Sequence, residues 1–477
     1  MTKTQIDWET IIGLEIHIQL STETKAFCAD DARFSIDPNM QTSIISLSHP
    51  GTLPKLNKKQ IEYAVRLGLA MNSEINKASY FERKQYFYPD LPKGYQISQQ
   101  TSPICIGGFI DLNTSQGQKK IRLHHIHMEE DAGKSVHDTD PSWSKIDLNR
   151  AGVPLLEMVT EPDFRNAEEV SIFLKELQRL VRYLGISDAN MEEGSMRCDV
   201  NISVRPMGSD ELRERCEVKN VNSRRFARKA IEYEVNRQIK KWESGERVVR
   251  QTMQFVPEEG ITTPIREKES AHDYRYFPDP DLPPIKLKQD YIDNIKSTLP
   301  SLPQELYNDL TKNKKLSDGD AQVLIDDKGI AGFYYELIKG KDDLIKPAAN
   351  WMIQIILPYL NEKNGSPDAL NHKKDDIRYI LGNIQNQSIT FQQAKEIWYD
   401  HLSNESISVE TLITNKLETT NDMDYDAVLT ELFEAYPLEA KEYKNGKKKL
   451  LGFFLGEVKK KYPQINLKEM QKKLGSS

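Results

Sequence analysis

Apolar and polar residues alternate from Ile12 to Ser21, which predicts a β-strand with one polar face. Glu15 and His17 are two positions apart, so both side chains leave that polar face. The stretch from Leu123 to Lys134 also begins like a strand, and Leu155–Val159 is an apolar strand-like run. We therefore expect the first ~290 residues to form mainly a sheet with a few helices.

Two of those helices have clear signals. In residues 166–184, apolar positions recur three and four apart, Asn166 and Glu169 resemble a capping box, and Gly185 supplies the stop. A second helix is predicted over residues 224–242, with Asn222 or Ser223 as its cap. Its inward residues are expected to be Phe226, Ile231, Val235, Ile239 and Trp242.

After the proline-rich segment Asp279–Pro284 the pattern becomes helical. The polar stretch 403–424 is typical of a linker or a loosely packed connection. Beyond it, Leu450, Phe454 and Val458 form a stripe that we assign to a small core. The fold class expected is α+β: an N-terminal domain with a mostly antiparallel sheet (1–293), an all-helical domain (294–405) and a helical tail domain (406–477). The helices predicted after residue 294 cover 304–313, 319–338, 345–360, 374–384 and 391–402.

Composition narrows the functional classes. The chain has 477 residues, of which 29% are charged and 38% hydrophobic, as in globular proteins. Its four cysteines are widely spaced and form no C-x-x-C pair, which fits a reducing compartment. We see no signal peptide and no membrane-spanning stretch, so a cytoplasmic location is expected.

Charge is distributed unevenly along the chain. The net charge is −7, yet residues 440–477 hold eleven lysines against three glutamates. A basic arm on an acidic body is typical of a tail that contacts nucleic acid. A solvated lysine-rich helix is the alternative.

Carboxylates and histidines recur in three strand-like segments. Glu15 and His17 share one face, Glu129–Asp131 follow three histidines, and Glu157 interrupts an apolar strand. A lone buried carboxylate costs several kcal/mol unless it is paired or bound to a metal. Oxygen ligands with one imidazole suit Mg²⁺ or Mn²⁺ better than zinc or copper. Separate salt bridges, such as Glu157 with Arg150, remain the alternative.

A turn-rich segment, residues 81–99, mixes basic and aromatic residues that could stack a base and bind phosphates. A tyrosine-rich hairpin is the other interpretation. The strand-like stretch 191–203 adds a further arginine among acids. The residues expected to bind the nucleotide are Arg83, Lys84, Tyr86, Tyr88, Lys93, Tyr95 and Arg197.

Nine collinear motifs resemble those of the B subunit of the glutamyl-tRNA/aspartyl-tRNA amidotransferase family, over most of residues 8–284. They are IGLEIHIQL, HPGTLPKLNKK, YFYPDLPKGYQISQ, HMEEDAGKS, DLNRAGVPLLE, EPDFRNAEE, NMEEGSMRCDVNIS, KNVNSRRFARKAIEYE and HDYRYFPDPDLPP. The helical middle and the basic tail also follow the layout of that family.

The resemblance implies a carbon–nitrogen ligase that uses ATP and Mg²⁺. Such a protein phosphorylates the side-chain carboxylate of Glu or Asp esterified to tRNA, and ammonia then displaces the phosphate. The ammonia would come from a partner amidase (glutaminase), with a small third protein completing the heterotrimer; neither DNA nor a membrane is expected as a partner. By motif, Glu15, His17, Glu130 and Glu157 would be the catalytic metal set, although the strand phase leaves open which acid of Glu129–Asp131 is the ligand. Residues from about 406 would grip the tRNA.

One departure concerns zinc. Many members of the family carry two cysteine pairs near the N-terminus that bind zinc, whereas here Cys28 is accompanied by Asp30, Ser43 and Ser46. One thiolate and one acid do not make a structural zinc site, so no zinc is expected. Two rival functions remain: a non-catalytic tRNA-binding component of such a complex, and a self-contained ligase that acts on a free amino acid.

Overall fold

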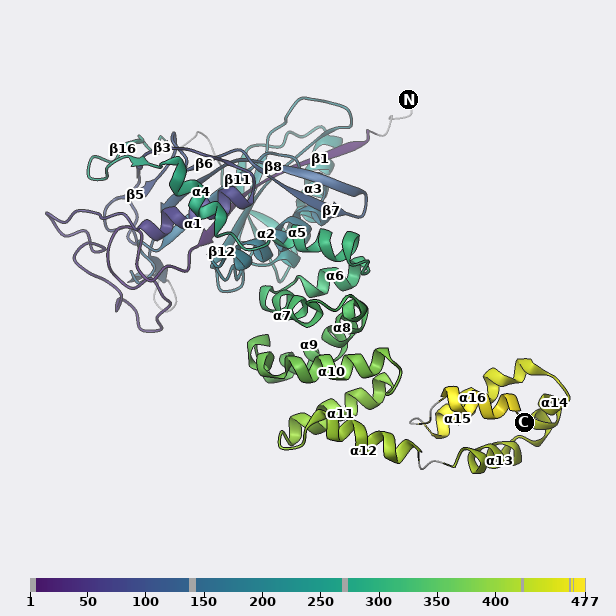
Figure 1. Ribbon diagram of the computed structural model, residues 1–477. Coiled ribbons are helices and arrows are strands. Elements are labelled where there is room, and N and C mark those ends of the chain that lie inside the picture. Colours follow the sequence, from purple (N-terminus) through teal and green to yellow (C-terminus); the bar gives the residue numbers. More distant parts are fainter. Residues whose placement is uncertain are drawn as a thin grey trace, which may run out of the picture. The chain divides into compact units, whose positions relative to one another are not determined.

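The computed structural model describes residues 6–136, 143–267, 273–421, 424–462, 465 and 467–476 (Figure 1). It divides into two compact units, Met1–Glu305 and Leu306–Ser477. The first is built on a large, mostly antiparallel sheet, and the second is helical. The predicted α+β class is confirmed.

The sheet of the first unit has the long strand β1 (Trp8–Gln19) at its centre. All neighbours on its main path are antiparallel except β13 and β14, which run parallel. The strand order is β15 (Ile261–Glu267), β14 (Gln251–Val256), β13 (Cys216–Lys219), β12 (Met196–Pro206), β1, β11 (Pro154–Thr160), β8 (Gly117–Glu130), β6 (Cys105–Ile106) and β2 (Glu74–Ile75), and β7 (Phe109–Thr114) also pairs with β8.

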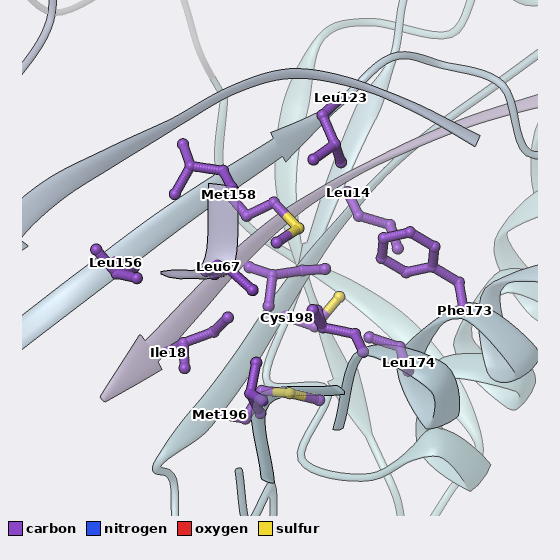
Figure 2. Packing of buried hydrophobic residues seen from close by; sticks show 14 of the residues in the cluster. Leu14, Ile18, Leu67, Leu123, Leu156, Met158, Phe173, Leu174, Met196 and Cys198 are labelled. Atoms are coloured by element: carbon purple, nitrogen blue, oxygen red, sulfur yellow. The ribbon is translucent and has the colours of Figure 1, made fainter. Parts of the chain in front are cut away.

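One face of this sheet is apolar and packs against helices. Alternation along β1 sends Leu14 and Ile18 to that face, where both are buried. Three helices contact the sheet: α1 (Lys58–Ala70), α2 (Ala167–Leu184) and α3 (Arg224–Glu243). Figure 2 shows Leu67 of α1 and Phe173 of α2 among the side chains of β1, β8, β11 and β12. The opposite face of the sheet is left for polar side chains.

The predicted limits of α2 are confirmed, and its caps explain them. The Asn166 side chain accepts a hydrogen bond from the Glu169 backbone N–H, at 2.9 Å. The Glu169 carboxylate accepts from the N–H of Arg165, one residue earlier than in a capping box. Gly185 ends the helix in the left-handed conformation, with φ of 66°.

Helix α3 begins at Ser223, which caps Phe226, so of the two expected caps Ser223 is the one used. Ile231 is buried as predicted, whereas Phe226 and Trp242 are only partly buried. The helix also buries polar residues that apolar periodicity did not identify, Glu234 and Gln238.

Smaller strands and one helix complete the first unit. A three-stranded sheet contains β16 (Phe277–Pro278), β4 (Glu82–Gln85) and β5 (Tyr95–Ser98). Two short pairs join β3 (Ala78–Ser79) to β17 (Ile285–Lys286) and β9 (Lys134–Val136) to β10 (Lys145–Asp147). Helix α4 (Gln289–Ser297) follows. His272, which begins the last matching motif, lies outside the described residues.

The second unit contains the predicted helices with two departures. The expected helix 319–338 is two helices, because the Asp327 side chain caps the second one through the Ile330 N–H at 3.0 Å. The expected helices 304–313 and 345–360 include π-helical turns, η1 and η3. The elements are α5 (Pro303–Asn308), η1 (Asp309–Asn313), α6 (Asp318–Leu324), α7 (Lys328–Ile338), η2 (Asp342–Leu344), α8 (Ile345–Trp351), η3 (Met352–Ile356), α9 (Leu357–Lys363), η4 (Pro367–Lys373), α10 (Lys374–Gln385) and α11 (Phe391–Ser403).

The expected linker 403–424 is wrong, because most of it is the helix α12 (Val409–Asn421). Val409 and Ile413, four residues apart, are each only 2% exposed and join the core of the preceding helices. The Ser408 hydroxyl accepts from the Thr411 N–H at 3.1 Å and caps the helix. Exposed threonines and charged residues on the outer side of the helix concealed this periodicity. The extents of the three expected domains stay a prediction.

The last helices have a separate apolar cluster. They are α13 (Tyr425–Ala435), α14 (Pro437–Lys444), η5 (Lys448–Leu450), α15 (Leu451–Lys461) and α16 (Leu467–Ser476). Phe454 and Val458 of the predicted stripe are buried in this cluster, with Leu450 packed against it, so the core assignment is confirmed. Among the described helices, none has the length and hydropathy needed to cross a membrane.

Candidate functional site

Three neighbouring strands place acids and histidines in one row on the polar face. In the register of the sheet, His17 of β1 lies opposite Glu157 of β11, and Glu157 lies opposite His127 of β8. Glu129 follows His127 by two residues and therefore shares its face. The antiparallel pairing brings together residues from three distant parts of the sequence.

His17 is the common partner of two carboxylates. Its Nε2 atom lies 3.3 Å from Glu129 Oε1 and 3.3 Å from Glu157 Oε2. Burial alone would lower the pKa of His17, but its hydrogen bonds to both acids raise that pKa to about 10. Burial would raise the pKa of Glu157, but the charge and hydrogen bond of His127, followed by those of His17, hold that pKa well below its usual range. Both carboxylates of the cluster are therefore ionised and face the imidazoles of His17 and His127.

The donor set of this cluster fits a hard divalent cation. One ligand atom each from His17, Glu129 and Glu157 lies within 4.8 Å of the other two. Neighbouring ligands of octahedral Mg²⁺ are about 3 Å apart, close to the two distances of 3.3 Å at His17. A single imidazole with carboxylates suits Mg²⁺ or Mn²⁺. His17, Glu129 and Glu157 would hold such a cation, and substrate oxygens or water would complete its ligands.

Glu15 lies on the same face, next to this cluster. Its Oε1 accepts a hydrogen bond from Asn201 Nδ2 at 2.9 Å. Burial raises the pKa of Glu15, and the negative charges of Glu157, Glu217 and Asp199 add to the effect. Lys219 pairs with Asp199 and, at 2.9 Å, with Glu217, so these acids continue the polar row across β12 and β13.

Glu130 is not brought to the cluster. Its carboxylate pairs with Lys93 Nζ at 2.6 Å and accepts from the Ile97 N–H at 3.0 Å. Consecutive residues of a strand point to opposite faces, so Glu129, and not Glu130, shares the face of His17. The ligand role expected for Glu130 stays untested, and the geometry places Glu129 where that ligand was expected.

Most of the predicted basic residues already have acidic partners. Arg83 Nε lies 3.0 Å from Asp279, and Arg83 Nη2 lies 2.6 Å from Asp281. Arg197 pairs with Asp131 at 2.8 Å, and Lys93 is held by Glu130. Arg150 also pairs with Asp131, at 3.3 Å, and not with Glu157, the pair that served as the example of the salt-bridge alternative.

The three tyrosines predicted to bind the nucleotide have different surroundings. Tyr86 makes an edge contact with Tyr274, and the Lys84 ammonium lies 5.0 Å from the centre of the Tyr274 ring. The pKa of Tyr86 is raised by burial and then by Glu129, which indicates that this tyrosine lies near the acidic cluster. The central carbon of the Arg83 guanidinium lies 4.2 Å from the centre of the Tyr95 ring. Tyr88 is exposed.

A cavity of about 410 Å³ opens on the polar face beside Glu15, between β1, β11 and β12. Arg213, Arg215 and Arg250 contribute to its wall. The Arg213 guanidinium stacks 4.3 Å from the centre of the Trp242 ring. Sequence analysis missed these arginines because they lie outside any periodic pattern. The signal for Arg213 and Arg215 was the charge-rich stretch 210–215, which does not include Arg250.

The positions that correspond to zinc-binding cysteines form a hydrogen-bonded cluster. Asp30 Oδ2 accepts from the Ser43 N–H at 3.0 Å and from the Ser46 hydroxyl. Burial raises the pKa of Cys28 to about 11, so its thiol stays protonated near neutral pH. Lys25 is fully buried, and its ammonium donates to the carbonyl oxygen of Gln41 at 2.6 Å.

Comparisons with known proteins identify the family of this chain. The family model of the GatB/GatE catalytic domain matches residues 10–293, and that of the GatB domain matches residues 333–474. A protein of Persephonella marina is 42% identical over 457 residues, covering 95% of this chain and 96% of the relative. One of Geotalea uraniireducens is 44% identical over 456 residues, covering 94% and 95%. Both are named as the B subunit of aspartyl/glutamyl-tRNA(Asn/Gln) amidotransferase, and at this identity and coverage the chain belongs to that family.

Proposed function

We propose that this chain is the component of a tRNA-dependent amidotransferase that activates the tRNA-borne carboxylate. It phosphorylates the side chain of Glu on tRNA(Gln), of Asp on tRNA(Asn), or of both, and then converts it to the amide. The observation that carries this proposal is the cluster of His17, Glu129 and Glu157, which gathers the ligands of a hard cation on one face of the sheet. The names of the relatives support the choice of substrate.

The chemistry explains the need for ATP. A carboxylate is a poor acyl donor, because oxide would have to leave. Its oxygen first attacks the γ-phosphorus of ATP and ADP departs; ammonia then attacks the acyl carbon and phosphate departs. Mg²⁺ bound at the cluster would neutralise charge on the phosphates. His17, Glu129 and Glu157 would hold that cation, and burial on the rigid sheet fixes their geometry.

We assign the phosphate chain of ATP to the cavity beside Glu15. Arg215 and Arg250 have no assigned acidic partner in the described part of the chain, in contrast to Arg83 and Arg197. Guanidinium groups bind phosphate oxygens through paired hydrogen bonds. Tyr86, near the cluster, and Lys84, whose ammonium lies 5.9 Å from the centre of the Tyr86 ring, would contribute the stacking wall that the sequence indicated.

The proposal includes a partner protein that supplies ammonia, and it includes no zinc. Each of the three buried cysteines has a pKa raised by burial, and Cys28 is likewise protonated, so among the described residues the thiols lack the features of an amidase nucleophile. Ammonia would therefore come from a separate amidase (glutaminase) protein, with a small third protein completing the complex. The basic tail would hold the tRNA, and the complex would act in the cytoplasm.

The test is tRNA-dependent ADP formation by the assembled complex. His17→Gln should reduce it by at least about 100-fold, because removing a metal ligand costs more than changing an outer residue. Glutamine hydrolysis by the partner amidase should remain measurable. Unchanged ADP formation would favour the rival, a non-catalytic tRNA-binding component. Full activity with free glutamate and no tRNA would favour a self-contained ligase.

A further inference from the structure

Three histidines of β8 form a column that ends at the candidate metal cluster. His124 Nδ1 lies 2.7 Å from His125 Nδ1, and His125 Nε2 lies 3.0 Å from His127 Nδ1. His127 Nε2 then faces the carboxylates, 3.4 Å from Glu157 and 3.7 Å from Glu129. Side-chain contacts thus run without interruption from an exposed ring to the cluster.

A β-bulge makes this column possible. Residues 124 and 125 are consecutive, and in a regular strand their side chains would leave opposite faces. The register between β8 and β11 shifts here: Val159 pairs with His125, and Thr160 pairs with Leu123. His124 is the extra residue of β8. A bulge redirects a side chain and is common next to functional sites.

His127 is held from two sides. Its ring stacks on that of His125, with centres 5.1 Å apart and planes 20° apart, in addition to the hydrogen bond between them. Its Nε2 faces acceptor oxygens, so this nitrogen carries hydrogen whether the ring is neutral or charged. His127 therefore donates toward Glu157, and His125 fixes the direction of that donation.

His127 itself stands outside the ligand set. The mutually close ligand atoms belong to His17, Glu129 and Glu157, and His127 contacts two of these residues. Groups that hydrogen-bond to metal ligands orient them and tune cation affinity. The position of His127 is that of such a group.

We propose that the column of His124, His125 and His127 is a positioning device that sets the affinity of the cluster for its divalent cation. His127 orients the carboxylates of Glu157 and Glu129, and His125 orients His127. The inference rests on the proposed function, because it requires that the cluster binds a cation. It adds His124 and His125, which precede the motif HMEEDAGKS, and gives His127, the first residue of that motif, a role beside the ligands.

The experiment is a Mn²⁺ titration of the full chain, followed by electron paramagnetic resonance. His127→Phe should raise the dissociation constant by about 10- to 100-fold, the usual effect of losing an outer partner. His125→Phe should raise it by a smaller factor, about 3- to 10-fold, because it acts through His127. His125→Gln keeps an amide that can hydrogen-bond to the His127 ring, so it should restore affinity to within about twofold. Exposed His372, substituted by Phe, is the matched control.

Three further observations distinguish a positioning role from misfolding, lost packing and direct metal ligation. Thermal unfolding midpoints show whether each variant is folded, and the glutamine variant separates lost orientation from lost packing. Nitrogen couplings of bound Mn²⁺ should report one imidazole ligand, His17; two would make His127 a ligand and overturn the positioning role. If His17→Gln abolishes binding while His125→Phe and His127→Phe bind normally, this inference fails and the proposed function stands. If His17→Gln binds Mn²⁺ normally, the metal cluster itself fails.

Discussion

His17 Nε2 and Glu129 Oε1 are 3.3 Å apart, although one residue lies near the start of the sequence and the other at the end of β8. Glu130, the next residue, points away from His17 and pairs with Lys93. One step along a strand thus separates a candidate ligand from an ion-paired side chain.

This relationship predicts different behaviour for two adjacent isosteric variants. Glu129→Gln should reduce tRNA-dependent ADP formation by at least about 100-fold, because it removes a charged ligand. Glu130→Gln should reduce it by less than about tenfold, since Glu130 lies outside the cluster. The measurement is ADP release by the assembled complex over a range of Mg²⁺ concentrations. Equal losses in both variants, or a larger loss at Glu130, would contradict the assignment of Glu129.

The arginines of the cavity predict that their substitution raises the KM for ATP. Arg215→Gln or Arg250→Gln should each raise the KM for ATP by about 10- to 100-fold, because a hydrogen bond to a charged group contributes about 1.5–3 kcal/mol. Arg33→Gln, which removes an exposed arginine paired with Asp31, is the control. Steady-state kinetics at saturating tRNA gives the values. A rise in the KM for tRNA alone would assign the cavity to the tRNA backbone instead.

A buried network on α3 predicts a stability effect. Glu234 is fully buried and accepts from Arg237 at 2.7 and 2.8 Å, from Gln238 at 2.8 Å and from Thr262 at 2.7 Å. Glu234→Gln should lower the free energy of unfolding of the first unit by about 3–5 kcal/mol at pH 7. Urea unfolding measures it. Glu232→Gln, on the same helix in an exposed pair with Arg228, should change it by less than about 1 kcal/mol.

The same network has a defined pH dependence. Burial would raise the pKa of Glu234, but the Arg237 hydrogen bonds outweigh it and lower that pKa below 4.5. Its contribution is therefore complete above pH 4.5 and is lost as the pH falls through the folded-state pKa. The difference between wild type and Glu234→Gln should shrink in acid. A difference that grows in acid would contradict the lowered pKa.

Helix α12 predicts where the tail can be removed. Truncation after Asn421 should leave the helical core intact, because Val409 and Ile413 remain in place. Truncation after Glu405 should destabilise that core, by about 2–5 kcal/mol for each large apolar side chain lost. Both should raise the KM for tRNA. Circular dichroism melts and aminoacyl-tRNA kinetics check the two effects, and equal melting of both truncations would contradict the packing of α12.

The cluster at Asp30 predicts independence from zinc. Elemental analysis should find less than about 0.1 zinc per chain, because a protonated Cys28 and a carboxylate held by Ser43 and Ser46 do not form a tetrahedral thiolate site. A chelator should leave the unfolding midpoint unchanged. One zinc per chain, or a melt that shifts with the chelator, would refute this.

Local patterns in the sequence were sufficient for the central strand, for two helices of the first unit and for part of the site. Alternation predicted β1 and placed Glu15 and His17 on one face, and spacing with caps predicted α2 and α3. These features depend on neighbours within a few residues, which the sequence displays directly. Helix α12 was missed because its polar side dominates its composition.

Tertiary structure alone decided what the strands bring together. The choice of Glu129 over Glu130 depends on the phase of β8, and the arginine cavity depends on loops that meet at the sheet. The histidine column depends on a bulge, which a single extra residue creates only once β8 pairs with β11. Register between distant strands is set by pairing and packing of the whole sheet, and no local window of sequence contains it.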